Sequence, residues 1–279
     1  MQMGLIRQKV EMNRSINVAK LLAAILTIWS GGLFFGTNSD AKSQELVNVI
    51  GFTGSEPFFL SNLPSQGLGI VPDLFSLIFQ DSPYKSEITE IPTTRFLDTI
   101  AQNTEFGLWA SYSSPIWYSE QEHARLGFSK QKLFEMCHLI VGRKNGAVAR
   151  TIPDMFNKTL VGIIGFRYGK IESQLSKTPQ AGKIHGVRVK TREAAISMIV
   201  SERADYFLSS SIRFYWTIAQ MNLSKNIFSI QTADAILPCI PIHAMYGAAA
   251  SASFVAAIDR GIAKLYANST IPKVLNNYR

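Results

Sequence analysis

The sequence predicts an α/β fold made of two units of similar size, each about one hundred residues long. Short apolar runs alternate with segments of helical periodicity, and the alternation restarts after an irregular stretch over residues 113–131. An apolar leader precedes both units. The 279 residues are 47% hydrophobic and 17% charged, a composition typical of a globular protein rather than a disordered one.

In the first unit, strands and helices are expected to alternate in the order β-α-β-α-β, which indicates a parallel sheet covered by helices. Pro72 suits the first turn of the first helix, and Leu74, Leu77 and Ile78 follow on one of its faces. The expected strands cover residues 46–52, 87–91 and 106–112, and the expected helices cover residues 72–81 and a segment that begins at residue 92.

The second unit repeats this order, with a clear buried strand over residues 159–164. Other expected strands cover residues 138–142, 187–189 and 205–208, and expected helices cover residues 152–157, 170–176 and a segment from residue 191 onward. The chain then continues into a strongly amphipathic helix over residues 254–266 and a last segment over residues 271–278.

The N-terminal leader has the pattern of a secretory signal. Lys20 precedes a short apolar run over residues 21–36, and the small residues Ser39 and Ala41 occupy the −3 and −1 positions of a cleavage site. We expect residues 1–41 to be a cleaved signal peptide and the protein to be periplasmic. An uncleaved membrane anchor and a buried helix are the alternatives, and either Met1 or Met12 could be the true start.

The charge and the cysteine content further limit the classes of function that this chain could have. The net charge of +8 could favour an anionic ligand or simply keep the protein soluble, and no Lys/Arg run with interleaved aromatic residues indicates a nucleic-acid partner. The four histidines are scattered, and there is no CxxC motif, so no metal site is expected. Cys137 and Cys239 could form a disulfide or remain as two buried thiols.

Two glycine-rich segments invite comparison with phosphate-binding loops. The Gly67-Leu68-Gly69 segment lacks the third glycine of a dinucleotide loop and is better interpreted as a turn. Residues 165–170 have the wrong spacing for a phosphate loop, but a glycine turn after a buried strand can offer backbone N–H groups to an anion. Arg167 would add a bidentate donor there. Ligand contact and a plain surface turn both remain open.

Serines follow two of the expected strands, at residues 111–114 and 209–211. In open α/β sheets, ligands bind beyond the carboxyl ends of the strands, although ordinary polar turns have the same composition. The sequence contains no serine-nucleophile motif, and no pair of carboxylates stands out for acid–base catalysis. We therefore expect a protein that is not an enzyme and that needs no cofactor.

Taken together, these segments resemble the bacterial extracellular solute-binding protein family 3, the amino-acid-type periplasmic binding proteins of ABC transporters, and most of all its divergent branch. Each motif is weak, but their order extends over nearly the whole chain after the leader. The motifs are Ser55-Glu56-Pro57-Phe58, residues 67–73, Pro92-x-x-Arg95, residues 106–111, Phe128-Ser129, residues 139–141, residues 160–163, residues 165–169, residues 202–205 and a terminal helix that ends at Tyr278.

The resemblance implies a type II periplasmic binding protein-like fold, with two lobes of mixed sheet flanked by helices and a ligand in the cleft between them. Residues 44–133 and 242–279 would form one lobe, residues 134–241 would form the other, and two crossings would join them. Cys137 and Cys239 would then face each other across the hinge. An ABC transporter membrane component would be the partner of a monomeric protein, and only an uncleaved leader would contact the membrane.

The resemblance also implies a set of ligand-binding residues. The implied set is Phe58, Trp109, Ala110, Ser111, Ser113, Arg167, Tyr168, Ser209 and Ser210. Of these, Trp109 could instead belong to the hydrophobic core. Glu122 stands where the family has its carboxylate-binding arginine, and no acid is present near Ser209 to bind an amine. We therefore expect a small polar molecule with an anionic group on Arg167, rather than an α-amino acid.

Two alternative functions use the same fold. A periplasmic enzyme similar to cyclohexadienyl dehydratases would need an acid in the cleft, and Glu56 and Glu122 are the candidates. A sensory or partner-presenting module would need a separate output protein. A ligand that is recovered unchanged would favour binding, whereas turnover would favour the enzyme.

Overall fold

The computed structural model describes residues 44–60, 67–92, 94–96, 98, 107–146, 148–166 and 168–278. The predicted leader, most of the helix predicted from residue 92 and the side chain of Arg167 lie outside these residues. Both sheets belong to one compact unit, Ser43–Arg279. None of the described helices combines the length and apolar character needed to cross a membrane.

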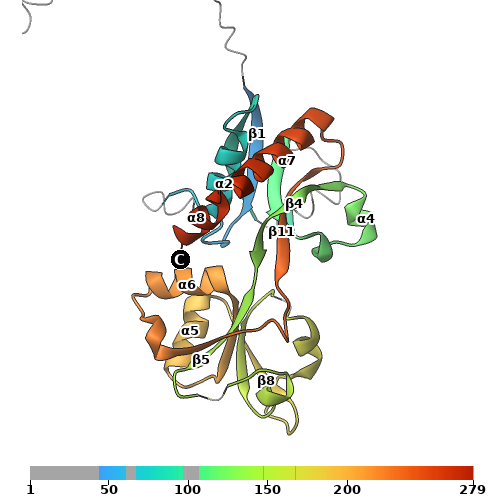
Figure 1. Ribbon diagram of the computed structural model, residues 1–279. Helices are drawn as coiled ribbons and strands as arrows, with labels where there is room; N and C mark the ends of the chain where they lie inside the picture. Colours follow the sequence, from blue (N-terminus) through green and yellow to red (C-terminus); the bar gives the residue numbers. More distant parts are fainter. Residues whose placement is uncertain are drawn as a thin grey trace, which may run out of the picture. The chain divides into compact units, whose positions relative to one another are not determined.

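The first sheet has the strand order β2-β1-β3-β11-β4 and forms, with its helices, what we call lobe one (Figure 1). Strand β1 pairs in parallel with β2 and β3, whereas β11 is antiparallel to β3 and β4. Its strands are β1 (Glu45–Phe52), β2 (Tyr84–Ile91), β3 (Trp109–Ser113), β4 (Leu126–Met136) and β11 (Ile240–Gly247). Its helices are α2 (Ile70–Phe79), α4 (Glu120–His123), α7 (Ala252–Ala267), α8 (Thr270–Asn276) and a 3-10 helix (Pro115–Trp117).

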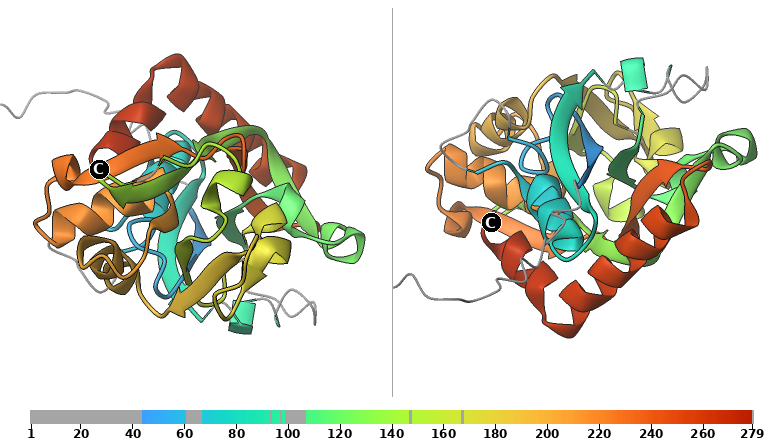
Figure 2. Two further views of the ribbon diagram at one scale, coloured as in Figure 1. Left: turned by 90° about the horizontal axis from the view of Figure 1, so that it is seen from below. Right: turned by 90° about the horizontal axis from the view of Figure 1, so that it is seen from above.

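Helices α2, α7 and α8 group together beside the first sheet (Figure 2). Helix α7 starts where the Ser251 side chain accepts a hydrogen bond from the Phe254 amide, and its buried stripe of Phe254, Ile258 and Ile262 contributes to the core of lobe one. Burying each such side chain contributes about 1.5–3 kcal/mol. This core therefore holds the C-terminal helices onto strands that come from the beginning of the chain.

The second sheet has the strand order β10-β5-β9-β6-β8-β7 and forms, with its helices, lobe two. Strand β6 is parallel to β8 and β9, whereas β5 is antiparallel to β9 and β10. Its strands are β5 (His138–Arg143), β6 (Thr159–Ile163), β7 (Leu175–Ser176), β8 (Ile184–Val189), β9 (Tyr206–Ser210) and β10 (Phe228–Thr232). Its helices are α5 (Arg192–Val200), α6 (Ser211–Gln220) and three 3-10 helices (Pro153–Met155, Gly169–Gln174 and Lys225–Ile227).

Two segments carry the chain between the lobes. Strand β4 leads through Cys137 into β5, and the chain returns past Cys239 into β11. Cys137 and Cys239 form a disulfide with an S–S distance of 2.04 Å, so a covalent bond joins the two crossings. The predicted lobe boundaries, 133/134 and 241/242, fall inside β4 and β11, and they remain a prediction.

Several local predictions differ from the structure, and strands β10 and β11 were not predicted at all. Strand β4 begins inside the stretch that was expected to be irregular, because its pairing with β11 is set by a segment more than a hundred residues away. The segment predicted as a helix over residues 170–176 is a 3-10 helix followed by β7. Helix α6 was not predicted, because its aromatic and β-branched residues are weak helix formers and burial of Phe214 and Ile218 stabilises it instead.

Candidate ligand-binding site

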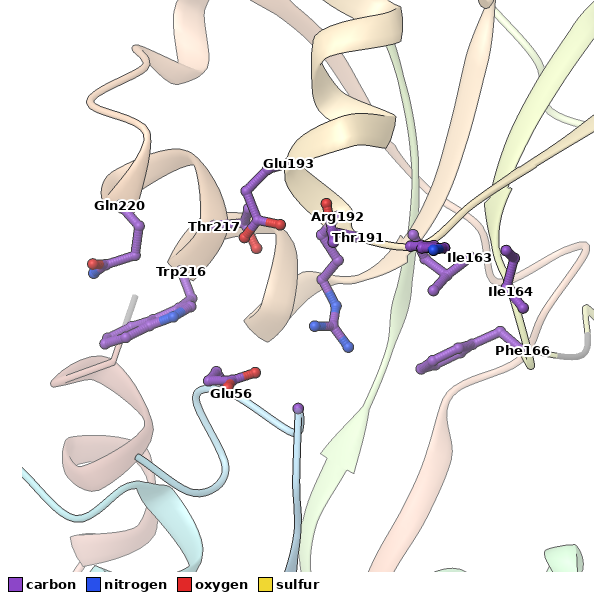
Figure 3. A pocket seen from close by; sticks show the side chains of 12 residues that line it. Glu56, Ile163, Ile164, Phe166, Thr191, Arg192, Glu193, Trp216, Thr217 and Gln220 are labelled. Atoms are coloured by element: carbon purple, nitrogen blue, oxygen red, sulfur yellow. The ribbon is translucent and has the colours of Figure 1, made fainter. Parts of the chain in front are cut away.

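A cavity of about 570 Å³ lies between the loop after β1 and the α5–α6 side of lobe two (Figure 3). This volume suits a small molecule. Its walls come from four segments that are far apart in the sequence. The lining residues are Gly54, Glu56, Ile163, Ile164, Phe166, Lys190, Thr191, Arg192, Glu193, Trp216, Thr217 and Gln220.

The cavity lies beyond the carboxyl ends of three strands. Strand β1 ends at Phe52, just before the loop that holds Glu56, and β6 ends at Ile163 before a turn in which Gly165 has φ 85°. Strand β8 ends at Val189, and the chain enters α5 three residues later. Carboxyl strand ends are the usual ligand-binding edge of an α/β sheet, and here they bring both lobes to one cavity.

Arg192 is the first residue of α5, and its guanidinium extends into the space between Glu56 and Phe166 (Figure 3). The Thr191 side chain caps this helix by accepting a hydrogen bond from the Ala194 amide at 3.2 Å. Burial, and then the charge of Arg213, lower the pKa of Arg192 to about 10. The charge of Arg213 therefore disfavours the protonated form of Arg192, and a bound anion would offset that effect.

Arg213, in the first turn of α6, occupies the junction between the lobes. Its guanidinium carbon lies 5.0 Å from the centre of the Phe58 ring and 5.5 Å from the centre of the Phe166 ring. Burial lowers the pKa of Arg213, and the neighbouring Tyr112 opposes that lowering. Within the described part of the chain, Arg213 Nε is buried and has no hydrogen-bond partner. Unpaired buried donors are costly, so this edge of the guanidinium is suited to a ligand oxygen.

Two other buried polar atoms without partners belong to the strand pair that precedes α6. His138 of β5 pairs with Ser210 of β9, and Ser210 immediately precedes α6. His138 Nδ1 and Ser210 Oγ are both buried, and neither has a hydrogen-bond partner among the residues that the structure describes. Burial, followed by the charge of Arg213, lowers the pKa of His138. Together with Arg213 Nε, these atoms form a group of buried polar atoms without partners on the side of lobe two that faces the crossings.

The structure places four of the predicted ligand contacts inside lobe one. Phe58 is 1% exposed and stacks on Phe134 at 5.7 Å between ring centres, so it supports Arg213 rather than lining the cavity. Ala110 and Ser111 are fully buried, and Ser111 Oγ donates to the Ile50 carbonyl at 2.7 Å. Ser113 Oγ and the Tyr118 hydroxyl are 3.0 Å apart.

The remaining predicted contacts are also occupied by protein groups or lie outside the described residues. Trp109 packs edge-on against Phe96, as the core interpretation expects. The Tyr168 hydroxyl accepts a hydrogen bond from the Ile163 amide at 2.9 Å. Ser209 Oγ donates to the Ser210 carbonyl at 3.3 Å, and Ser210 lies at the start of α6 as described above. Arg167 is outside the described residues and remains a prediction.

The two glycine segments behave as turns. The Gly69 amide donates to the Tyr278 hydroxyl at 3.2 Å, so it is not available to a phosphate. In the turn after β6, the amides of Ile164, Phe166 and Tyr168 donate to protein oxygens. Among the described residues, this turn therefore contributes Ile164 and Phe166 to the cavity lining rather than a cradle of N–H groups.

Of the two acids considered for catalysis, only Glu56 lines the cavity. Glu122 belongs to an exposed capping box at the start of α4, where hydrogen bonds from Ser119 lower its pKa.

Sequence analysis did not select Arg192, Arg213 or Phe166. Arg192 could have been found, because it follows the predicted strand 187–189 at the edge where ligands bind.

No family model and no curated protein matches this chain. Solved structures of similar fold do exist, and three of them illustrate the range. Substrate-binding domain 2 of GlnP from Lactococcus lactis is 14% identical, with a TM-score of 0.61, covering 84% of this chain and 95% of that one. The periplasmic VFT2 domain of BvgS from Bordetella pertussis is 13% identical, with a TM-score of 0.59 and coverage of 84% and 93%. The GluR0 ligand-binding core from Nostoc punctiforme, in complex with L-glutamate, is 19% identical, with a TM-score of 0.58 and coverage of 84% and 98%.

These likenesses, at less than 20% identity, concern the fold. They agree with the observed arrangement of two mixed sheets flanked by helices and joined by two crossings. The predicted fold class is confirmed: this chain has the type II periplasmic binding protein-like fold.

Proposed function

We propose that this chain is an exported solute-binding protein that captures a small anionic molecule between its two lobes and delivers it to an ABC transporter. The observation that carries the proposal is the pair of arginines on lobe two. Arg192 extends into the cavity, and Arg213 presents a buried, unpartnered Nε beside Phe166. A carboxylate or similar anion would supply the missing acceptor and offset the effect of the Arg213 charge on Arg192.

Contacts between the lobes suggest how a ligand would be enclosed. Arg213 of lobe two lies on Phe58 of lobe one, and Trp216 lies against Tyr278 with ring centres 6.1 Å apart. In a hinge protein, the ligand stabilises the closed state by the contacts it makes only there. Since Arg213 is both an inter-lobe contact and a ligand contact in this proposal, anion binding would favour closure.

The export part of the proposal rests on the leader and on the disulfide. A basic residue, an apolar run and small residues at −3 and −1 are typical of a cleaved signal. The bond between Cys137 and Cys239 is suited to an oxidising compartment. Expression of the full chain in a bacterial host tests this part: cleavage after Ala41 and release with the periplasmic fraction are expected, whereas retention of an intact leader would favour the membrane-anchor alternative.

The proposal includes no catalysis, although Glu56 keeps the dehydratase-like alternative open to test. The solved structures described above are binding domains by their titles. A binding protein returns its ligand unchanged. Any small molecule that stabilises the protein is therefore to be recovered and analysed after incubation, and conversion of the molecule would replace the binding proposal with an enzymatic one.

The anion site is tested with the purified protein in a thermal-shift screen of small carboxylates and phosphorylated metabolites. Hits should raise the melting temperature, because they bind only the folded state. Arg192→Ala should weaken binding of an anionic hit about tenfold or more, as expected for loss of a charge-assisted hydrogen bond. Arg260→Ala, an exposed arginine of α7, is the matched control and should bind like wild type. Equal affinity in Arg192→Ala and wild type would refute the site.

A further inference from the structure

We infer that Glu56 determines specificity, and that the ligand joins its anionic group to a hydrogen-bond donor, a hydroxyl or an ammonium group, that faces lobe one. The inference rests on the proposed function, because it assumes that the anion lies on the arginines of lobe two. It adds to that proposal which end of the ligand faces which lobe, and to which chemical class the ligand belongs.

The first observation is that Glu56 and Arg192 line the same cavity from opposite lobes without pairing, while Lys190 and Glu193 also line it from lobe two. Glu56 comes from the loop after β1, and Arg192 comes from the start of α5. Neither the Glu56 nor the Arg192 side chain makes a hydrogen bond, or an ion pair within 4 Å, with any described residue. Figure 3 shows the Glu56 side chain and the Arg192 guanidinium, which come from different segments, near each other in the cavity lining.

The second observation is that the backbone holds Glu56 in this position. Its neighbours Ser55 and Pro57 are both buried, while Glu56 itself is only partly exposed. A partly buried carboxylate without a partner is unfavourable, and so is a partly buried guanidinium. A ligand between them can satisfy both groups at once if it carries an acceptor at one end and a donor at the other.

The same geometry argues against ligands that are anionic throughout. Phosphate, sulfate or an unsubstituted carboxylate would bring negative charge toward Glu56 and leave that carboxylate without a donor. The charge of Glu56 also acts on both arginines, since it opposes the lowering of their pKa values. Glu56 therefore selects against plain anions and for anions that bear a donor, and such a ligand would draw the two lobes together.

The test compares wild type with Glu56→Gln, using two matched sets of small probes. One set is acetate, glycolate and glycine, and the other is butyrate, 4-hydroxybutyrate and 4-aminobutyrate. In each set the first molecule is an anion alone, the second adds a hydroxyl and the third adds an ammonium group. Binding is measured by thermal shift and calorimetry, together with inorganic phosphate as a probe of charge. Glu120→Gln, an exposed acid of α4 outside the cavity lining, is the control.

In wild type, at least one donor-bearing molecule should bind several-fold more tightly than the plain carboxylate of its set. Glu56→Gln should reduce that preference and should bind inorganic phosphate several-fold more tightly than wild type, because a negative charge has been removed. Glu56→Asp, which keeps the acid, should retain the preference and shows that the fold tolerates a change at this position. Whether the hydroxyl or the ammonium compound binds more tightly identifies the donor.

The inference is overturned if plain and donor-bearing carboxylates bind equally in wild type, if none of them binds, or if Glu56→Gln changes neither the preference nor phosphate binding. Failure of the proposed function looks different. If Arg192→Ala binds phosphate and the carboxylates like wild type, the anion site itself is wrong. If Arg192→Ala loses binding while Glu56→Gln has no effect, the anion site stands and only the role of Glu56 is rejected.

Discussion

At the scale of single residues, the site is defined by charged side chains that form no ion pair with another residue in the described part of the chain. Arg213 lies on the rings of Phe58 and Phe166, and these contacts constrain its orientation before any ligand arrives. Arg192 is less constrained, but burial and the nearby cation still lower its pKa to about 10. Preorganised donors of this kind favour binding, because little side-chain freedom is lost when the ligand binds.

The pKa of Arg192 predicts how anion binding depends on pH. The protonated guanidinium binds an anion and the neutral form does not, so affinity should be constant near neutral pH and should fall as the pH rises through about 10. A bound anion favours the protonated form, which moves the decline upward in the complex. Calorimetric dissociation constants measured from neutral pH to about pH 11 check this. A constant affinity over that range would show that Arg192 does not hold the anion.

At the scale of elements, one hydrogen-bonded tyrosine links the end of the chain to the start of α2. The Tyr278 hydroxyl donates to Asp73 Oδ2 at 2.8 Å and accepts from the Gly69 amide at 3.2 Å. Gly69 has φ 112°, and a Cβ atom there would lie 2.6 Å from the Phe58 carbonyl oxygen, so only glycine fits this turn. The contact therefore lies next to the backbone of Phe58, the residue that supports Arg213.

Tyr278→Phe should lower the free energy of unfolding by about 1–3 kcal/mol, because the Gly69 amide and the Asp73 carboxylate lose a buried partner. Denaturant titration measures this, with Tyr266→Phe on α7 as a more exposed control. Burial and Asp73 raise the pKa of Tyr278 to about 12. The stabilisation should therefore be complete below the ordinary tyrosine pKa of about 10 and be lost as the pH rises toward 12. Equal stability of Tyr278→Phe and wild type would contradict the role of this contact.

At the scale of the whole molecule, the lobes are connected by two crossings that a disulfide joins. Cys137 and Cys239 are 102 residues apart in the sequence, and the loop that the bond closes contains nearly all of lobe two. Strand β11 then enters the first sheet between β3 and β4, so the last strand of the chain completes the sheet that the first strand began. Lobe one therefore forms only after the chain has passed through lobe two.

The double variant Cys137→Ser/Cys239→Ser should be less stable than the oxidised protein by about 3–5 kcal/mol, since a long loop is no longer closed in the unfolded state. Denaturant titration with and without reductant measures the difference. Reductant should destabilise wild type and leave the double variant unchanged. Mass analysis without reductant should find no free thiol in wild type, and two alkylated cysteines would contradict the bond.

Much of the fold could be predicted because its elements have local signals. The strand at residues 46–52 and the helix at residues 254–266 have apolar residues at the spacing that their own conformation requires. Strand β4 and helix α6 were missed for the opposite reason. Their conformation depends on pairing and packing with distant segments, and neither segment has a strong intrinsic preference for the conformation it adopts.

By itself, the sequence determined the α/β order and the two-unit organisation, because apolar periodicity is a property of the linear chain. The expectation of a ligand other than an α-amino acid came from the absence of an acid near Ser209, and it stays a prediction. Only the tertiary structure decided which charges meet. It placed Phe58 beneath Arg213 and set Glu56 opposite Arg192. Such encounters depend on the crossings and on the order of strands in each sheet, which join segments that no local pattern connects.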